Sequence, residues 1–159
     1  MNEIRTGIGW DIHRLTAGRP LILGGVTVPS EVGLEGHSDA DILSHAITDA
    51  LLGAAALGDI GTHFPDSDPQ WKDADSLQFL AHSAELVREC GFAIVHIDSN
   101  VILQQPKLKD FRQAIRESLA RTLHLEIEQI SVKFKTAEGI GPVGLSLSAE
   151  AQAIVTLAR

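Results

Sequence analysis

The chain has 159 residues, of which 44% are hydrophobic and 21% charged, and this balance predicts one globular domain over residues 1–159. Its formal net charge of −8 argues against nucleic acid as a partner, because phosphate backbones are bound by clustered Lys and Arg. The apolar runs are too short to cross a membrane, the N-terminal segment predicts no secretory signal, and Cys90 has no second cysteine with which to pair. We therefore expect a cytoplasmic protein with a reduced thiol.

The first part of the sequence predicts strands followed by a helix. A strand is expected over residues 4–13, and LILGGVTV at 21–28 predicts a hairpin with a two-glycine turn. A wide apolar stripe then predicts a helix from about residue 39 to about residue 56, with Ser38 as its N-cap and Asp41 as the capping-box partner. A loop rich in Gly, Asp and Pro follows.

The remaining sequence predicts two more helices and three strands. One helix runs between Asp75 as N-cap and Gly91 as C′, and another covers 108–123. Strands are expected at 92–103 and 130–136, and a long one at 145–158, where apolar residues fall on every second position. The sum is an α+β fold, with a single mixed β-sheet and helices packed on one face. The small residues of the last strand suggest close packing against another subunit.

Asp11 and His13 are two residues apart, so on a strand both side chains point to the same face. A carboxylate and an imidazole can hold a divalent metal, and catalytic zinc takes three protein ligands with one open position. We expect His45 as the third ligand, with Asp41 or Asp49, one helical turn away, orienting its ring. The alternative is a surface Asp–His pair and an ordinary helical histidine.

Two segments near this pair carry polar groups suited to anions. His37 and Ser38 precede the expected helix N-terminus, where free backbone N–H groups favour negative charge, although an ordinary N-cap explains them as well. The loop GDIGTHFPDSD contains Asp59, Asp66 and Asp68, for which a solvated loop is the alternative.

Two further segments place polar groups after strands. Lys107 and Lys109 follow one strand, and Thr136 and Glu138 end another. Glu138 can hold a hard cation such as Mg²⁺, and the Thr136 hydroxyl can contact a phosphate. Together these groups indicate phosphate chemistry supported by metal ions.

The motifs DIHRL, HSDADILSHAITDALLGAAALGDIGTHFPDSD and KTAEG resemble the 2-C-methyl-D-erythritol 2,4-cyclodiphosphate synthases, enzymes of the non-mevalonate pathway of isoprene biosynthesis. The resemblance runs through essentially the whole chain. It implies a lyase that cyclises 4-diphosphocytidyl-2-C-methyl-D-erythritol 2-phosphate and releases CMP. It also implies a homotrimer whose active sites lie between adjacent subunits.

The resemblance assigns roles to individual residues. Asp11, His13 and His45 are the implied Zn²⁺ ligands, and Glu138 the implied ligand of a second ion, Mg²⁺ or Mn²⁺. His37 and Thr136 are the implied catalytic pair that steadies the transition state. The implied contacts of the erythritol and diphosphate parts of the substrate are Asp11, Ile12, His13, His37, Ser38, Asp59, Ile60, Gly61, Phe64, Pro65, Asp66, Ser67 and Asp68. The implied contacts of cytidine and the neighbouring phosphates are Leu103, Gln104, Gln105, Pro106, Lys107, Leu108, Lys109, Lys135, Thr136, Ala137 and Glu138.

The chain departs from the family in the segment KTAEGIGPVG. Lys135 and Ala137 stand where the family has threonines, Pro142 replaces an aromatic residue, and an arginine is missing. The resemblance therefore does not extend to the isoprenoid diphosphate that can lodge in the family's three-fold cavity. Two other hypotheses remain: a metal-dependent phosphohydrolase that uses water, and a trimeric nucleotide- or metal-binding module without catalysis.

Overall fold

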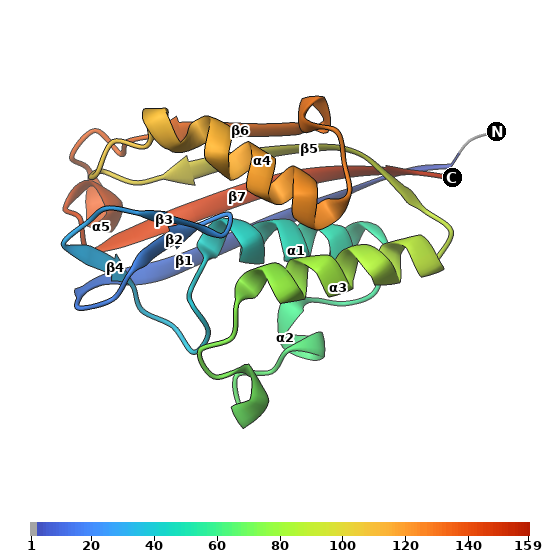
Figure 1. Ribbon diagram of the computed structural model, residues 1–159, viewed down its shortest axis with the longest axis horizontal. Helices are drawn as coiled ribbons and strands as arrows, with labels where there is room; N and C mark the ends of the chain where they lie inside the picture. The colour runs from blue at the N-terminus through green and yellow to red at the C-terminus, as the bar shows by residue number, and fades with distance from the viewer. Residues whose placement is uncertain (1–2) are drawn as a thin grey trace.

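The larger sheet has five strands in the order β4-β1-β7-β5-β6 (Figure 1). The computed structural model describes residues 3–159, so the first two residues of the expected domain lie outside the described part of the chain. The strands are β1 (Ile4–Ala17), β4 (Val32–Leu34), β5 (Ala93–Ile102), β6 (Ile130–Lys135) and β7 (Ser148–Ala158). Strands β5 and β6 are parallel and the other pairs antiparallel, which confirms a mixed sheet in an α+β fold.

A second, two-stranded sheet makes the prediction of a single sheet wrong. It is the expected hairpin, β2 (Leu21–Leu23) paired with β3 (Val26–Val28). Its turn residues Gly24 and Gly25 have φ of 56° and 75°, the left-handed region that glycine tolerates. A Cβ at Gly24 would lie 2.8 Å from the Cγ2 atom of Ile115, so the turn packs against a helix instead of extending the large sheet.

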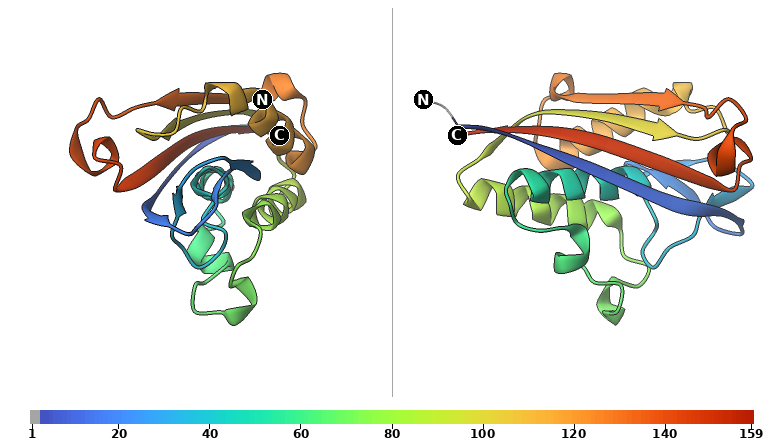
Figure 2. Two further views of the ribbon diagram at one scale, coloured as in Figure 1. Left: turned by 60° about the vertical axis from the view of Figure 1, so that its left-hand side comes forward. Right: turned by 180° about the vertical axis from the view of Figure 1, so that it is seen from behind.

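Three longer helices cover one face of the curled sheet (Figure 2). They are α1 (Ile42–Ala54), α3 (Ser76–Glu89) and α4 (Arg112–Leu123). The shorter elements are the helices α2 (Ile60–His63) and α5 (Gly141–Gly144) and the 3-10 turns η1 (Pro69–Trp71), η2 (Lys109–Phe111) and η3 (Ile127–Gln129). The described helices include none that is both long and apolar enough to cross a membrane.

Helix α1 begins later than predicted, and its N-cap is Asp41 rather than Ser38. Ala40 has a φ of 59°, outside the range of a right-handed helix, so the helix cannot extend back through it. The Ser38 hydroxyl instead accepts a hydrogen bond from the Ala40 N–H at 3.2 Å. By contrast, α3 has the predicted N-cap Asp75 and is followed by Gly91 with a φ of 81°.

Strand β7 begins at Ser148, three residues later than predicted. Residues 141–144 form α5, and Ser146 has a φ of 56°, so the chain turns before the strand starts. Leu145 and Leu147, expected on the buried face, are exposed. From Ala149 to Leu157 every second residue is buried, as the alternation predicts.

Glycines in β1 allow α1 to lie directly on the sheet. A Cβ at Gly7 would come within 2.0 Å of the Ala50 carbonyl oxygen, and one at Gly9 within 1.9 Å of the Ala46 carbonyl oxygen. Because β1 alternates, Asp11 shares this covered face with both glycines. The close approach therefore carries His45, next to Ala46, toward Asp11.

Candidate active site

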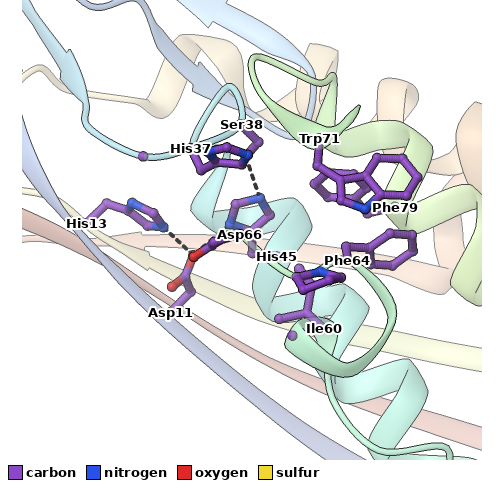
Figure 3. Close-up of a pocket in the computed structure, with 13 residues that line it drawn as sticks. Asp11, His13, His37, Ser38, His45, Ile60, Phe64, Asp66, Trp71 and Phe79 are labelled. Atoms are coloured by element: carbon purple, nitrogen blue, oxygen red, sulfur yellow. Dashed lines mark hydrogen bonds and ion pairs between the residues drawn. The ribbon is translucent and has the colours of Figure 1, made fainter. Parts of the chain in front are cut away.

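Three predicted metal ligands converge where β1 meets α1 (Figure 3). The Oδ2 atom of Asp11 lies 3.1 Å from Nε2 of His13 and 3.0 Å from Nδ1 of His45. One ligand atom from each of the three residues falls within 4.8 Å of the others. The exposed fractions of the side chains are 24% for Asp11, 20% for His13 and 12% for His45, so the cluster is shielded from most of the solvent but not fully buried.

The outer nitrogen of each imidazole has a partner of its own. His13 Nδ1 lies 2.5 Å from the carbonyl oxygen of Glu35. His45 Nε2 lies 2.8 Å from the Ser76 hydroxyl and 3.2 Å from the Ser38 hydroxyl. Each ring thus turns its other nitrogen toward Asp11, which is the arrangement that metal-binding histidines need.

The aspartates expected to orient His45 have other partners. Asp41 is fully buried, and its carboxylate accepts hydrogen bonds from the N–H groups of Gly24 and Gly25 in the hairpin. Asp49 accepts from the Ile60 N–H at 2.8 Å. Prediction of these residues as orienting groups was therefore wrong.

Charge within the cluster favours an ionised carboxylate. Burial acts to raise the pKa of Asp11, but hydrogen bonds and charge from His13 and His45 outweigh it and hold the pKa below its usual value. Burial likewise acts to lower the pKa of His13, and the Asp11 carboxylate outweighs it, so that the pKa is raised. A bound cation would take the place of the protons that this pairing favours.

The donor set fits a divalent ion. One carboxylate oxygen and two imidazole nitrogens are the ligands of many catalytic zinc sites, and three protein ligands leave a position for substrate. Gly36 supports the fit, because a Cβ there would lie 2.9 Å from Cε1 of the His13 ring. A side chain at that position would displace the ligand.

A hollow of about 400 Å³ opens beside the cluster. Its lining includes the predicted metal ligand His45 and most of the residues predicted for the first part of the substrate: Asp11, His13, His37, Ser38, Ile60, Gly61, Phe64, Pro65 and Asp66. Sequence reasoning missed Gly36, Trp71 and Phe79. Phe79 lies on the apolar face of α3 and stacks on Phe64 with ring centroids 4.5 Å apart, so its sequence pattern indicated only a core residue.

Three residues predicted in the loop after α1 lie outside that lining. Asp59 is the exposed N-cap of α2 and accepts from Thr62. Ser67 is exposed, and Asp68 is the N-cap of the 3-10 turn η1. The carbonyl oxygen of Asp68 nevertheless lies 3.3 Å from Nε2 of His37, so this loop contacts the pocket wall.

The predicted cytidine segment borders a separate hollow of about 220 Å³. Its lining is Leu103, Pro106, Lys107, Leu108, Lys109, Arg112, Phe134, Lys135 and Thr136. Arg112 and Phe134 were missed, although Arg112 lies over the Phe134 ring at 5.3 Å from the guanidinium carbon to the ring centroid. The two hollows share no lining residue, so Thr136 and His37 border different hollows of one chain.

The remaining predicted residues lie near this second hollow or elsewhere. Glu138 accepts a hydrogen bond from the Thr136 hydroxyl at 3.0 Å, and it belongs to no group of three potential ligands among the described residues. The Gln104 side-chain oxygen accepts from the Gly139 N–H. Gln105 and Ala137 do not line either hollow, and Ile12 lines a third one with Pro142.

The fold and the site define an α+β protein whose mixed sheet carries, beside a pocket, an Asp–His–His cluster that could hold a metal ion. A model of the YgbB family matches residues 4–158, and the chain belongs to that family. The 2-C-methyl-D-erythritol 2,4-cyclodiphosphate synthase of Solibacter usitatus is 68% identical over 159 residues, the whole of both chains.

Solved structures agree with this assignment. A 2C-methyl-D-erythritol-2,4-cyclodiphosphate synthase described as the bound form with CDP is 43% identical, with a TM-score of 0.89, over 96% of this chain and 99% of that one. The bifunctional IspDF of Campylobacter jejuni is 44% identical, with a TM-score of 0.96, over 99% of this chain and 43% of its own.

Proposed function

We propose that this chain is a single-domain lyase of the non-mevalonate isoprenoid pathway, which converts 4-diphosphocytidyl-2-C-methyl-D-erythritol 2-phosphate to 2-C-methyl-D-erythritol 2,4-cyclodiphosphate. An oxygen of the 2-phosphate forms a bond to the β-phosphorus, the bond from that phosphorus to the CMP oxygen breaks, and CMP leaves with the electron pair. The observation that carries the proposal is the convergence of Asp11, His13 and His45 on one pocket, in a chain similar over its whole length to synthases of this name.

Asp11, His13 and His45 would hold Zn²⁺. Bound there, the ion supplies positive charge beside the diphosphate. His37, on the same pocket wall, would donate a hydrogen bond to a phosphoryl oxygen, and the apolar floor at Phe64 would exclude water that could compete as nucleophile. Positioning and charge stabilisation carry most of the rate in such phosphoryl transfers.

The second hollow would bind the cytidine end of the substrate. The related synthase described with CDP supports a cytidine nucleotide as ligand. Lys107, Lys109 and Arg112 bring positive charge to this hollow in an otherwise acidic chain. Thr136 would contact the phosphates, and Glu138 would bind Mg²⁺ or Mn²⁺.

A homotrimer with active sites between subunits would bring the two hollows together. Within one chain they share no lining residue, so Thr136 of one copy would have to meet His37 of the next. The face of the sheet without helices exposes the large apolar side chains of Ile8, Trp10 and Ile154. Burial of this face between copies would remove it from water.

Phosphorus NMR of the zinc-loaded protein with this substrate and Mg²⁺ tests the proposal. We expect two coupled cyclic diphosphate signals together with CMP. His45→Ala should yield neither product and bind less zinc, because one of three ligands is lost. His124→Asn is the matched control: it removes an exposed histidine that lies outside both hollows and whose φ of 53° asparagine tolerates. Linear phosphate products would indicate a phosphohydrolase, and no turnover a binding module; either result would refute the proposal.

A further inference from the structure

A chain of polar groups runs from His45 away from the pocket. The Ser76 hydroxyl, on the first residue of α3, lies 2.8 Å from Nε2 of His45. The same hydroxyl makes a short hydrogen bond to Oδ1 of Asp39, in the loop before α1. Ser76 is fully buried, so water does not substitute for these partners.

The direction of the hydrogen bonds follows from the donors around Asp39. Its Oδ1 accepts from the Asp41 N–H and its Oδ2 from the Ser76 N–H, both at 3.1 Å. The carboxylate thus acts as an acceptor throughout, and the single Ser76 hydroxyl hydrogen is directed at it. The Ser76 oxygen is then left as an acceptor, so the hydrogen between it and His45 belongs to Nε2 of the imidazole.

We propose that Ser76 and Asp39 are positioning residues: they keep the Nε2–H group of His45 donating to the Ser76 oxygen, so that Nδ1, which otherwise pairs with Asp11, is the ring nitrogen left for a metal. This inference rests on the metal-binding role proposed for His45. A neutral imidazole has one donor and one acceptor nitrogen, and the hydrogen bond made by the outer nitrogen decides which one can bind a metal. The Asp39 carboxylate orients the Ser76 hydroxyl, and the Ser76 oxygen in turn orients the His45 ring.

The two imidazoles are oriented by different means. His13 Nδ1 meets a backbone carbonyl oxygen, that of Glu35, which no substitution at that position removes. His45 depends on side chains, so its tautomer can be changed without touching a ligand. The Ser38 hydroxyl lies farther from Nε2 of His45, at 3.2 Å; it accepts from the Ala40 N–H, and its own hydrogen can go to the Ser76 oxygen, 3.4 Å away. It is the weaker partner of the ring.

The first test compares Ser76→Ala with Ser83→Ala. Both remove a buried hydroxyl from α3, but the Ser83 hydroxyl has no hydrogen-bond partner within the described residues. Titration with Co²⁺, followed by its absorbance, gives metal affinity without substrate. We expect Ser76→Ala to weaken binding about 10-fold or more, in the range for lost outer partners of metal ligands. Ser83→Ala should leave binding within about twofold of the parent value.

Proton–nitrogen NMR of the Zn²⁺-loaded protein reads the hydrogen bond of Nε2 directly. The parent should show the Nε2–H proton of His45 protected from exchange with water, and Ser76→Ala should lose this protection. Asp39→Asn supplies a second case. Its amide can donate to the Ser76 oxygen, which turns the serine hydrogen toward His45, so that Nδ1 keeps its proton and metal binding weakens. A role of Ser76 in stability alone would leave the Nε2–H signal and the metal affinity unchanged in both variants.

The outcomes separate this inference from the proposed function. If the parent binds Co²⁺ and the Ser76 and Asp39 variants match it in affinity and in the Nε2–H signal, the positioning role is wrong and the metal site stands. If the parent binds no Co²⁺, the metal role is wrong and the positioning role falls with it.

Discussion

Replacement of Gly9 by alanine tests whether the contact between β1 and α1 builds the metal cluster. The new Cβ would lie 1.9 Å from the Ala46 carbonyl oxygen, whereas such contacts are essentially never found below 3.0 Å. Helix α1 must therefore retreat by at least about 1 Å, since backbone atoms on both sides cannot rotate away. Overpacking of a core costs about 1–3 kcal/mol of unfolding free energy, and we expect the upper part of that range.

The same displacement should weaken metal binding, because His45 precedes Ala46 and moves with it. Metal–ligand distances tolerate deviations of only about 0.2 Å, far less than the retreat of the helix. Urea unfolding and Co²⁺ titration measure the two effects. Gly53→Ala is the control on the same helix: a Cβ there meets nothing within 4 Å, and alanine should stabilise the helix by up to about 1 kcal/mol. A Gly9→Ala protein as stable as the parent, with equal Co²⁺ affinity, would refute the reasoning.

Asp41→Ala should lower the free energy of unfolding by about 3 kcal/mol or more. The backbone N–H groups of Gly24, Gly25 and Ser44 would lose their acceptor, at a cost of about 1–3 kcal/mol each. Urea unfolding measures the loss, and a value below about 1 kcal/mol would contradict this reasoning. A pH dependence is expected at Asp59, where hydrogen bonds from the Thr62 hydroxyl and N–H hold the pKa below its usual value. The folded pKa lies below the unfolded one of about 3.9, so this stabilisation is present above that value and is lost as the pH falls through the folded pKa. Thr62→Ala should therefore be less stable than the parent at neutral pH, and the gap should narrow as the pH falls below the unfolded pKa of about 3.9. A gap that stays constant across this fall in pH would exclude this origin.

Periodicity predicted the elements whose residues obey local rules. Strand β6, the hairpin turn and the N-cap of α3 follow from alternation, from two adjacent glycines and from Asp75. The starts of α1 and β7 were misplaced for one physical reason. Ala40 and Ser146 adopt positive φ without being glycine, and tertiary contacts impose such conformations against local preference.

The convergence of Asp11, His13 and His45 was predictable because their spacing has a direct geometric meaning. Asp11 and His13 share a strand face, and His45 occupies the first turn of the neighbouring helix. The groups that orient His45 were missed, because Ser76 is 31 residues away and reaches the ring only when α3 packs beside α1. Nearby aspartates on α1 were better candidates by sequence, but the fold gives them other partners.

Net charge misleads about an anionic ligand when many acidic groups are engaged internally. Of the 21 acidic residues, Asp39 and Asp41 accept backbone N–H groups, and Asp11 faces two imidazoles. Groups of the chain itself are thus the partners of these carboxylates before any ligand arrives. Four of the 13 Lys and Arg residues, Lys107, Lys109, Arg112 and Lys135, line the second hollow, which shares no lining residue with the hollow beside the Asp–His–His cluster. In the proposed trimer, neutralisation of a diphosphate would depend on joining these two surfaces, a property that a count of charges does not reveal.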